Sequence, residues 1–265
     1  MPTVQITQLR QECQALLVYF DAPEHLASEI DKLLDHYALR AKRRGKVRRT
    51  GTVLKRYETP QAVLRQLRLE LLPRVQAQPK AGLALADALW AHRMLETRLL
   101  AIRLLGSLPE AAFRSVSKRL FEWTLENREE QLLRELAERG THSLREREPA
   151  ALLKLAGRLF KKKELRARAT GLLALKALLE HSRVANFPEL LRLLTPLSRN
   201  PPRSLRPYLL ELYAALVDHS PGEALYFLQQ RLAEDPGPGT RWVARQSLKF
   251  FPPDSRQALQ EALDS

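Results

Sequence analysis

Five arginines recur at the start of leucine-rich helical segments, and their spacing is the strongest chemical pattern in the chain. The steps between successive members are 36, 34, 38 and 35 residues. A period in the thirties with two helices per unit is typical of an α-solenoid, in which each helix pair buries its apolar face against its neighbours. If the units stack in register, the guanidinium groups form a ladder that suits a polyanion. The five are Arg98, Arg134, Arg168, Arg206 and Arg241.

Other basic residues collect at the turns inside the predicted pairs and in the first turns of the second helices. Arg241, Arg245 and Lys249 fall at i, i+4 and i+8, which is one stripe of a helix. Cations at a helix N-terminus oppose the macrodipole, whereas a bound phosphate would explain them, because free N–H groups attract anions and Arg offers a bidentate fork. The alternative is that some pair with Glu96, Glu135 or Glu164. The rest of the group are Lys161, Lys162, Lys163, Arg166, Arg199 and Arg203.

Residues 40–56 hold nine Lys or Arg, two Gly and no acidic residue. Without apolar periodicity this segment is predicted to be a loop kept open by self-repulsion. A run of like charge is often only solvated, but a long loop between helical regions is commonly functional. We therefore expect phosphate contacts from this loop. The candidates are Arg43, Arg44, Lys46, Arg48 and Arg49.

Composition limits the class of protein. The 265 residues are rich in Leu and poor in Ile, carry a formal net charge of +14, and have a pI near 10.2. This favours an all-α fold and a polyanionic partner such as nucleic acid or an anionic membrane. The single cysteine, Cys13, excludes a disulfide framework and is expected to be a buried thiol. No apolar window predicts a transmembrane helix and no signal peptide is evident, so we expect a cytoplasmic protein without a membrane partner. We also expect a monomer.

Signatures of catalysis or of a cofactor are lacking. The sequence has no glycine-rich phosphate loop, no HExxH and no nucleophile elbow. The six histidines have no ligand spacing, so neither a metal nor another cofactor is expected. Trp90 and Trp123 lie on apolar stripes and are predicted to be core residues. Trp242 follows Arg241 and is either a core anchor or a platform for a sugar or base.

Apolar periodicity predicts helices along a single domain, 1–265. Residues 1–78 carry helices 3–20, 22–43 and 59–72, the last ended by Pro73, around the basic loop. Five helix pairs follow over 79–250, with prolines at or near several helix starts, and a capping helix closes the array at 253–263. The pairs are 81–91 with 94–106, 110–126 with 128–139, 149–160 with 164–180, 187–198 with 202–218, and 222–233 with 239–250.

From about Leu83 to Leu259 the chain resembles the HEAT-like DNA alkylation repair family, which are alkylpurine DNA glycosylases. The similar pieces are ADALWAHRMLETRLLAIRLL, EQLLRELAERG and ARQSLKFFP. The resemblance implies an all-α, HEAT-like solenoid of antiparallel helix pairs, C-shaped with a basic concave face. It also implies that this face holds duplex DNA by its backbone, with excision of cationic alkylated purines.

The catalytic positions of that family are not preserved. Its Trp-Asp-x-Val-Asp motif places Glu130 where the tryptophan belongs and Arg134 where the last aspartate belongs, and its second tryptophan falls at Glu211. Arg134 would oppose a developing oxocarbenium cation. We therefore predict binding of nucleic acid, duplex DNA in particular, without standard glycosylase chemistry. Two alternatives stay open: a rearranged glycosylase using Glu130 and Glu211, and a scaffold for a protein or RNA.

Overall fold

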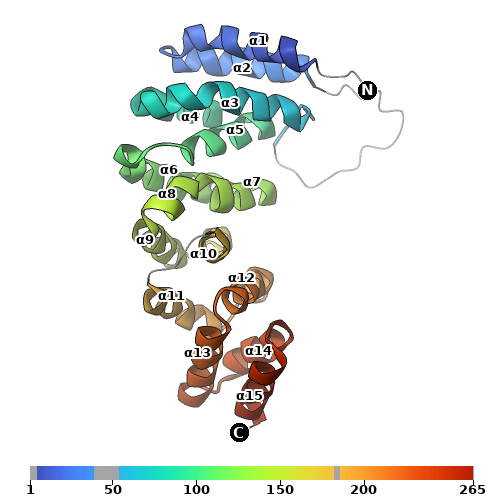
Figure 1. The fold of residues 1–265 in the computed structure, drawn as a ribbon, viewed down its shortest axis with the longest axis vertical. Coiled ribbons are helices and arrows are strands. Elements are labelled where there is room, and N and C mark those ends of the chain that lie inside the picture. The colour runs from blue at the N-terminus through green and yellow to red at the C-terminus, as the bar shows by residue number, and fades with distance from the viewer. Residues whose placement is uncertain (1–4, 39–53, 182–185, 265) are drawn as a thin grey trace, which may run out of the picture. The chain divides into compact units, whose positions relative to one another are not determined.

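The computed structural model describes residues 5–38, 54–181 and 186–264 (Figure 1). The described residues are almost entirely helical and contain no strand, only an isolated bridge between Lys55 and Met94. This confirms the all-α prediction for the described part of the chain. None of its helices combines the length and apolar character needed to cross a membrane. The chain forms two compact units, Met1–Leu144 and Arg145–Ser265, and its organisation as one domain stays a prediction.

The first unit is built from two sets of packed helices. In one set α1 packs on α3, α3 on α5, and α5 on α7 and on the π-helical turn η3. In the other, α2 packs on α4, and α4 also packs on α5. The helices are α1 (Ile6–Leu16), α2 (Pro23–His36), α3 (Gln61–Ala77), α4 (Pro79–Ala91), α5 (Leu95–Leu105), α6 (Phe113–Glu126), α7 (Glu130–Glu135), η3 (Leu136–Gly140) and, across the boundary of the units, α8 (His142–Arg147).

The second unit is centred on α10, which packs on both α9 and α12. Leucines on nearly every face of α10 are buried, as expected for a helix enclosed by others. Tyr213 of α12 is fully buried, and its hydroxyl shares a hydrogen bond of 2.7 Å with Ser198 Oγ of α11. The helices are α9 (Pro149–Phe160), α10 (Leu165–His181), α11 (Phe187–Arg199), α12 (Arg206–His219), α13 (Pro221–Glu234), α14 (Pro238–Ser247) and α15 (Pro253–Asp264).

Each helix of the five predicted pairs has a counterpart, but four details of the helix prediction are wrong. The second helix ends at His36, before the run of basic residues. Helix α3 continues through Pro73 to Ala77. Pro73 has no N–H to donate, yet Leu69, four residues earlier, is exposed to water and Val75 is fully buried, so burial extends the helix. The segment predicted as 128–139 divides into α7 and η3, and α8 was not predicted.

Candidate nucleic-acid interface

A basic pocket of about 420 Å³ lies within the first unit, between α3, α5 and the turn from η3 into α8. Four of its seven lining side chains carry guanidinium groups, and none carries a carboxylate. We call this the basic pocket. Its lining residues are Gln61, Arg65, Arg68, Arg103, Ser107, Arg139 and His142.

Three of these arginines follow the period of the helix pairs. Arg68, Arg103 and Arg139 are separated by 35 and 36 residues and lie on α3, α5 and η3, which pack consecutively. None of the site residues expected from the sequence lines this pocket. Arg103 and Arg139 each follow an expected residue, Arg98 or Arg134, by five positions. The repeat spacing was therefore the signal that could have identified them.

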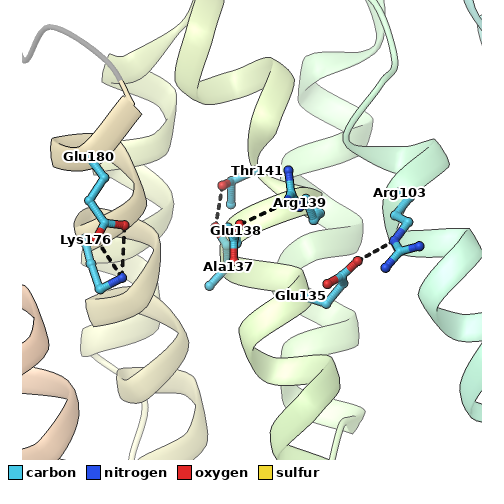
Figure 2. Close-up of polar contacts among 8 residues, drawn as sticks. All are labelled: Arg103, Glu135, Ala137, Glu138, Arg139, Thr141, Lys176 and Glu180. Atoms are coloured by element: carbon cyan, nitrogen blue, oxygen red, sulfur yellow. Dashed lines mark hydrogen bonds and ion pairs between the residues drawn. The ribbon is translucent and has the colours of Figure 1, made fainter. Parts of the chain in front are cut away.

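Ion pairs hold two of the four guanidinium groups in place. Arg103 Nε lies 2.5 Å from Glu135 Oε1 of α7, and Arg139 Nη2 lies 3.3 Å from Glu138 Oε1 (Figure 2). Within the described part of the chain no carboxylate pairs with Arg65 or Arg68. The Nε atom of Arg68 is buried and has no hydrogen-bond partner among the described residues. The basic pocket thus keeps positive charge that the described residues do not neutralise.

The π-helical turn η3 positions Arg139 at the pocket. A Cβ atom on Gly106 would lie 1.9 Å from the carbonyl oxygen of Arg139, so only glycine permits this approach of α5 to η3. The Gly106 carbonyl accepts a hydrogen bond of 3.0 Å from the Ser143 N–H. Thr141 Oγ1 donates to the Ala137 carbonyl at 2.6 Å (Figure 2). Short π segments inside α-helices are rare and occur frequently at functional sites.

Three of the five expected arginines bind the backbone of the helix or turn that precedes them. The Nε atoms of Arg98, Arg168 and Arg241 donate to carbonyl oxygens of Trp90, Lys162 and Pro236 at 3.1, 2.7 and 3.1 Å. Each is the fourth residue of its helix. Arg256, the fourth residue of α15, does the same with the Leu248 carbonyl at 3.1 Å. We call these four residues the fastening arginines, because each ties a helix start to the end of the preceding segment.

The other two expected arginines have side-chain partners. Arg134 is exposed and its Nε lies 3.0 Å from Glu130 Oε1, one helical turn away. The Arg206 guanidinium lies over the Trp242 ring, 4.4 Å from its centroid, so one face of this half-buried indole is already covered. The phosphate contacts expected from all five arginines stay a prediction.

Most of the other expected cations of the second unit are exposed, but Lys162 is half-buried. Lys249 is exposed and lies 5.1 Å from the Phe250 ring centroid. Arg199 pairs with Asp235 at 2.6 Å. The exposed members of the second unit are Lys161, Lys163, Arg166, Arg203, Arg245 and Lys249. The loop candidates Arg43, Arg44, Lys46, Arg48 and Arg49 lie outside the described residues.

Two buried glutamates bind the end of the basic run and the residues directly after it. Glu96 accepts backbone hydrogen bonds from Tyr57 and Glu58 at 3.1 and 2.9 Å. Glu129 accepts one from Leu54 at 2.9 Å. Glu135, one of the acidic residues considered as partners, pairs with Arg103, which was not among the expected cations. Glu96, another of them, accepts hydrogen bonds from backbone N–H groups.

The two carboxylates considered for catalysis lie in different units. Glu130 is exposed and paired with Arg134. Glu211 lines a pocket of about 630 Å³ in the second unit. Glu180 also lines this pocket and pairs with Lys176 at 2.9 Å (Figure 2). Among the described residues no group of three His, Cys, Asp or Glu side chains could hold a metal ion.

Comparisons with protein-family models, with curated proteins and with solved structures find no match to this chain. Its function must therefore be argued from the geometry of its own residues.

Proposed function

We propose that the protein is a HEAT-like α-solenoid that binds nucleic acid, duplex DNA in particular, mainly through phosphate groups. The observation that carries this proposal is the basic pocket, where arginines one helix pair apart converge and no carboxylate lines the wall. Arginine is the side chain best suited to phosphate, because its planar fork donates two parallel hydrogen bonds. The resemblance to the DNA alkylation repair family agrees with this partner and with a C-shaped array whose concave face is basic.

Exposed cations would supply the remaining contacts. Arg166 and Arg203 are exposed at the start of α10 and in the turn before α12, where free N–H groups also favour anions. The basic segment 40–56 could follow the backbone or enter a groove. The fastening arginines are less suited to this role than their sequence positions suggest, because their Nε atoms already donate to carbonyl oxygens.

Such contacts position a nucleic acid but carry little information about base sequence. We therefore expect weak sequence preference and steep dependence on salt, with log K falling by roughly 0.9 per phosphate neutralised for each tenfold rise in salt. A glycosylase reaction is not part of the proposal, because Glu130 is ion-paired at the surface.

The proposal is tested by fluorescence anisotropy with a labelled DNA duplex over a salt series. The double variant Arg166→Glu with Arg203→Glu should weaken binding and flatten the salt slope by about two phosphate contacts. Lys32→Glu with Lys118→Glu is the matched control, since it changes net charge equally at exposed positions of the first unit. Affinity independent of salt, or equal loss in both double variants, would refute specific phosphate contacts. If unlabelled DNA, structured RNA and heparin displace the labelled duplex equally well, the protein binds polyanions without specificity for nucleic acid.

A further inference from the structure

We infer that the basic pocket binds a phosphate monoester, the group found at the phosphorylated end of a nucleic-acid strand. This inference rests on the proposed function and adds to it a preferred part of the ligand. A phosphate within a strand carries one negative charge, whereas a terminal monoester carries close to two at neutral pH. The pocket can therefore distinguish them by charge.

The charge of the pocket fits the dianion. Arg103 and Arg139 are each balanced by a glutamate outside the lining. Arg65 and Arg68 have no carboxylate partner in the described part of the chain and leave two positive charges facing the pocket. A buried polar atom without a partner is destabilising, and Arg68 Nε is such an atom. A phosphate oxygen would satisfy it.

The chemistry of the wall favours the phosphate and not the base or sugar. Besides guanidinium groups the lining offers the Ser107 hydroxyl, the Gln61 amide and the His142 imidazole, with no tryptophan, tyrosine or phenylalanine. Sites that recognise a nucleobase present aromatic or apolar surfaces on which the ring stacks. The pocket therefore suits an oxyanion whose attached nucleoside extends towards solvent.

The size of the pocket favours a strand end over an internal stretch of double helix. Its volume of about 420 Å³ is at the low end of the range for small-molecule sites, roughly 300–1,000 Å³. A double helix, whose major groove alone is about 12 Å wide, is too wide to enter it as a whole, so a phosphate inside a duplex can contact only its rim. A strand end can enter, because its terminal phosphate has a neighbour on one side only.

The test compares two DNA duplexes of one sequence, with a 5′-phosphate or a 5′-hydroxyl end. The phosphorylated duplex should bind roughly tenfold or more tightly, the effect expected of added charge-assisted hydrogen bonds. Arg65→Gln with Arg68→Gln should abolish this preference, so that the variant binds the phosphorylated and the hydroxyl duplex with equal affinity. Arg74→Gln with Lys80→Gln is the matched control, because it also removes two positive charges, at exposed positions that do not line the pocket. Circular dichroism checks that the variants fold.

The outcomes separate the two proposals. Equal affinity for both duplexes would overturn the monoester site and leave the proposed function standing. Absence of binding to either duplex would overturn the proposed function and the strand-end site together. Inorganic phosphate and a nucleoside 5′-monophosphate serve as competitors. If they alone bind, with loss in the Arg65/Arg68 variant, the ligand is a small phosphate compound and the strand-end assignment is wrong.

Discussion

The guanidinium group of Arg98 lies 4.4 Å from the centre of the Trp90 ring and donates to the carbonyl oxygen of the same tryptophan. Trp90 stacks in turn on Trp123, with ring centroids 4.4 Å apart and planes 2° from parallel. Both tryptophans are buried, which confirms their assignment to the core. One arginine thus closes an aromatic stack and caps the end of α4. Burial lowers the pKa of the Arg98 guanidinium, an effect that Glu126 opposes.

Replacement of Arg98 should destabilise the first unit. Arg98→Gln removes a hydrogen bond to a helix C-terminus and a cation–π contact, so we expect a loss of about 1–2 kcal/mol in unfolding free energy. Arg98→Lys keeps the charge but not the planar guanidinium group, so its unfolding free energy should lie between those of the wild type and Arg98→Gln. Urea denaturation measures both. The neighbouring exposed Arg93→Gln is the control, and equal effects at the two positions would contradict a fastening role.

Gly106→Ala should disturb both stability and the basic pocket. Its methyl group would lie 1.9 Å from the Arg139 carbonyl oxygen, and overpacking of this kind destabilises by about 1–3 kcal/mol. Since η3 must move, Arg139 moves with it and phosphate binding should weaken. Gly222→Ala, where nothing lies within 4 Å of the added methyl group, should be neutral or slightly stabilising. Thermal unfolding measures the loss of stability, and fluorescence anisotropy measures the loss of binding. If Gly106→Ala is as stable as the wild type, Gly106 does not approach the Arg139 carbonyl oxygen this closely.

Glu96→Ala should loosen the end of the basic run and the residues directly after it. The substitution leaves the N–H groups of Tyr57 and Glu58 without their acceptor, and we expect a loss of about 1–3 kcal/mol. Limited trypsin digestion should then cut faster after Lys55 and Arg56. Glu58→Ala removes a carboxylate of equal charge from the segment itself and is the comparison. Unchanged digestion in Glu96→Ala would show that these hydrogen bonds do not hold the segment.

Cys13 should make stability fall in alkali. Burial, with the nearby carboxylates Glu70 and Glu12, raises the pKa of its thiol from 9.0 to about 12. The folded state thus holds this proton more tightly, so the contribution is complete below about pH 9 and is lost as pH rises towards 12. Unfolding free energy should fall by up to about 1.4 kcal/mol per pH unit there. Iodoacetamide should not modify the native thiol near neutral pH.

Cys13→Ala should remove the first part of that alkaline slope. Tyr37 donates to Glu12 at 2.7 Å, and the pKa of its hydroxyl is raised from 10.0 to about 12, chiefly by burial and next by this hydrogen bond. Tyr37→Phe should therefore act only above about pH 10. Denaturation at several pH values separates the two residues. An unchanged slope in Cys13→Ala would show that the thiol is not responsible.

The helices were predictable because local signals mark them. Pro149 and Pro221 are the first residues of α9 and α13, and Pro188 is the second of α11; in these positions a missing N–H is tolerated. The helix end predicted at Pro73 was wrong because proline usually ends a helix unless packing of the residues beyond it compensates for the lost hydrogen bond. The burial of Val75 supplies that packing, and it cannot be predicted from the neighbouring sequence. Residue propensities likewise do not predict the π-helical form of η3.

The site was harder to predict for a physical reason. An arginine in the first turn of a helix has the same sequence pattern whether it faces a phosphate, as expected of Arg168, or a carbonyl oxygen, which Arg168 binds. Which of the two the arginine faces depends on the path of the preceding chain. The spacing of Arg68, Arg103 and Arg139 was visible in the sequence, but their convergence depends on the close approach at Gly106.

The fastening arginines change how the basicity of this chain should be interpreted. Each of the four is joined to a neutral carbonyl oxygen and so needs no acidic residue to match it. Four of the 44 Lys and Arg residues therefore join successive helical segments. A protein that uses such joints gains one positive charge at each of them, even before selection for any ligand. The high isoelectric point of such a protein then partly reflects arginines that join its helices.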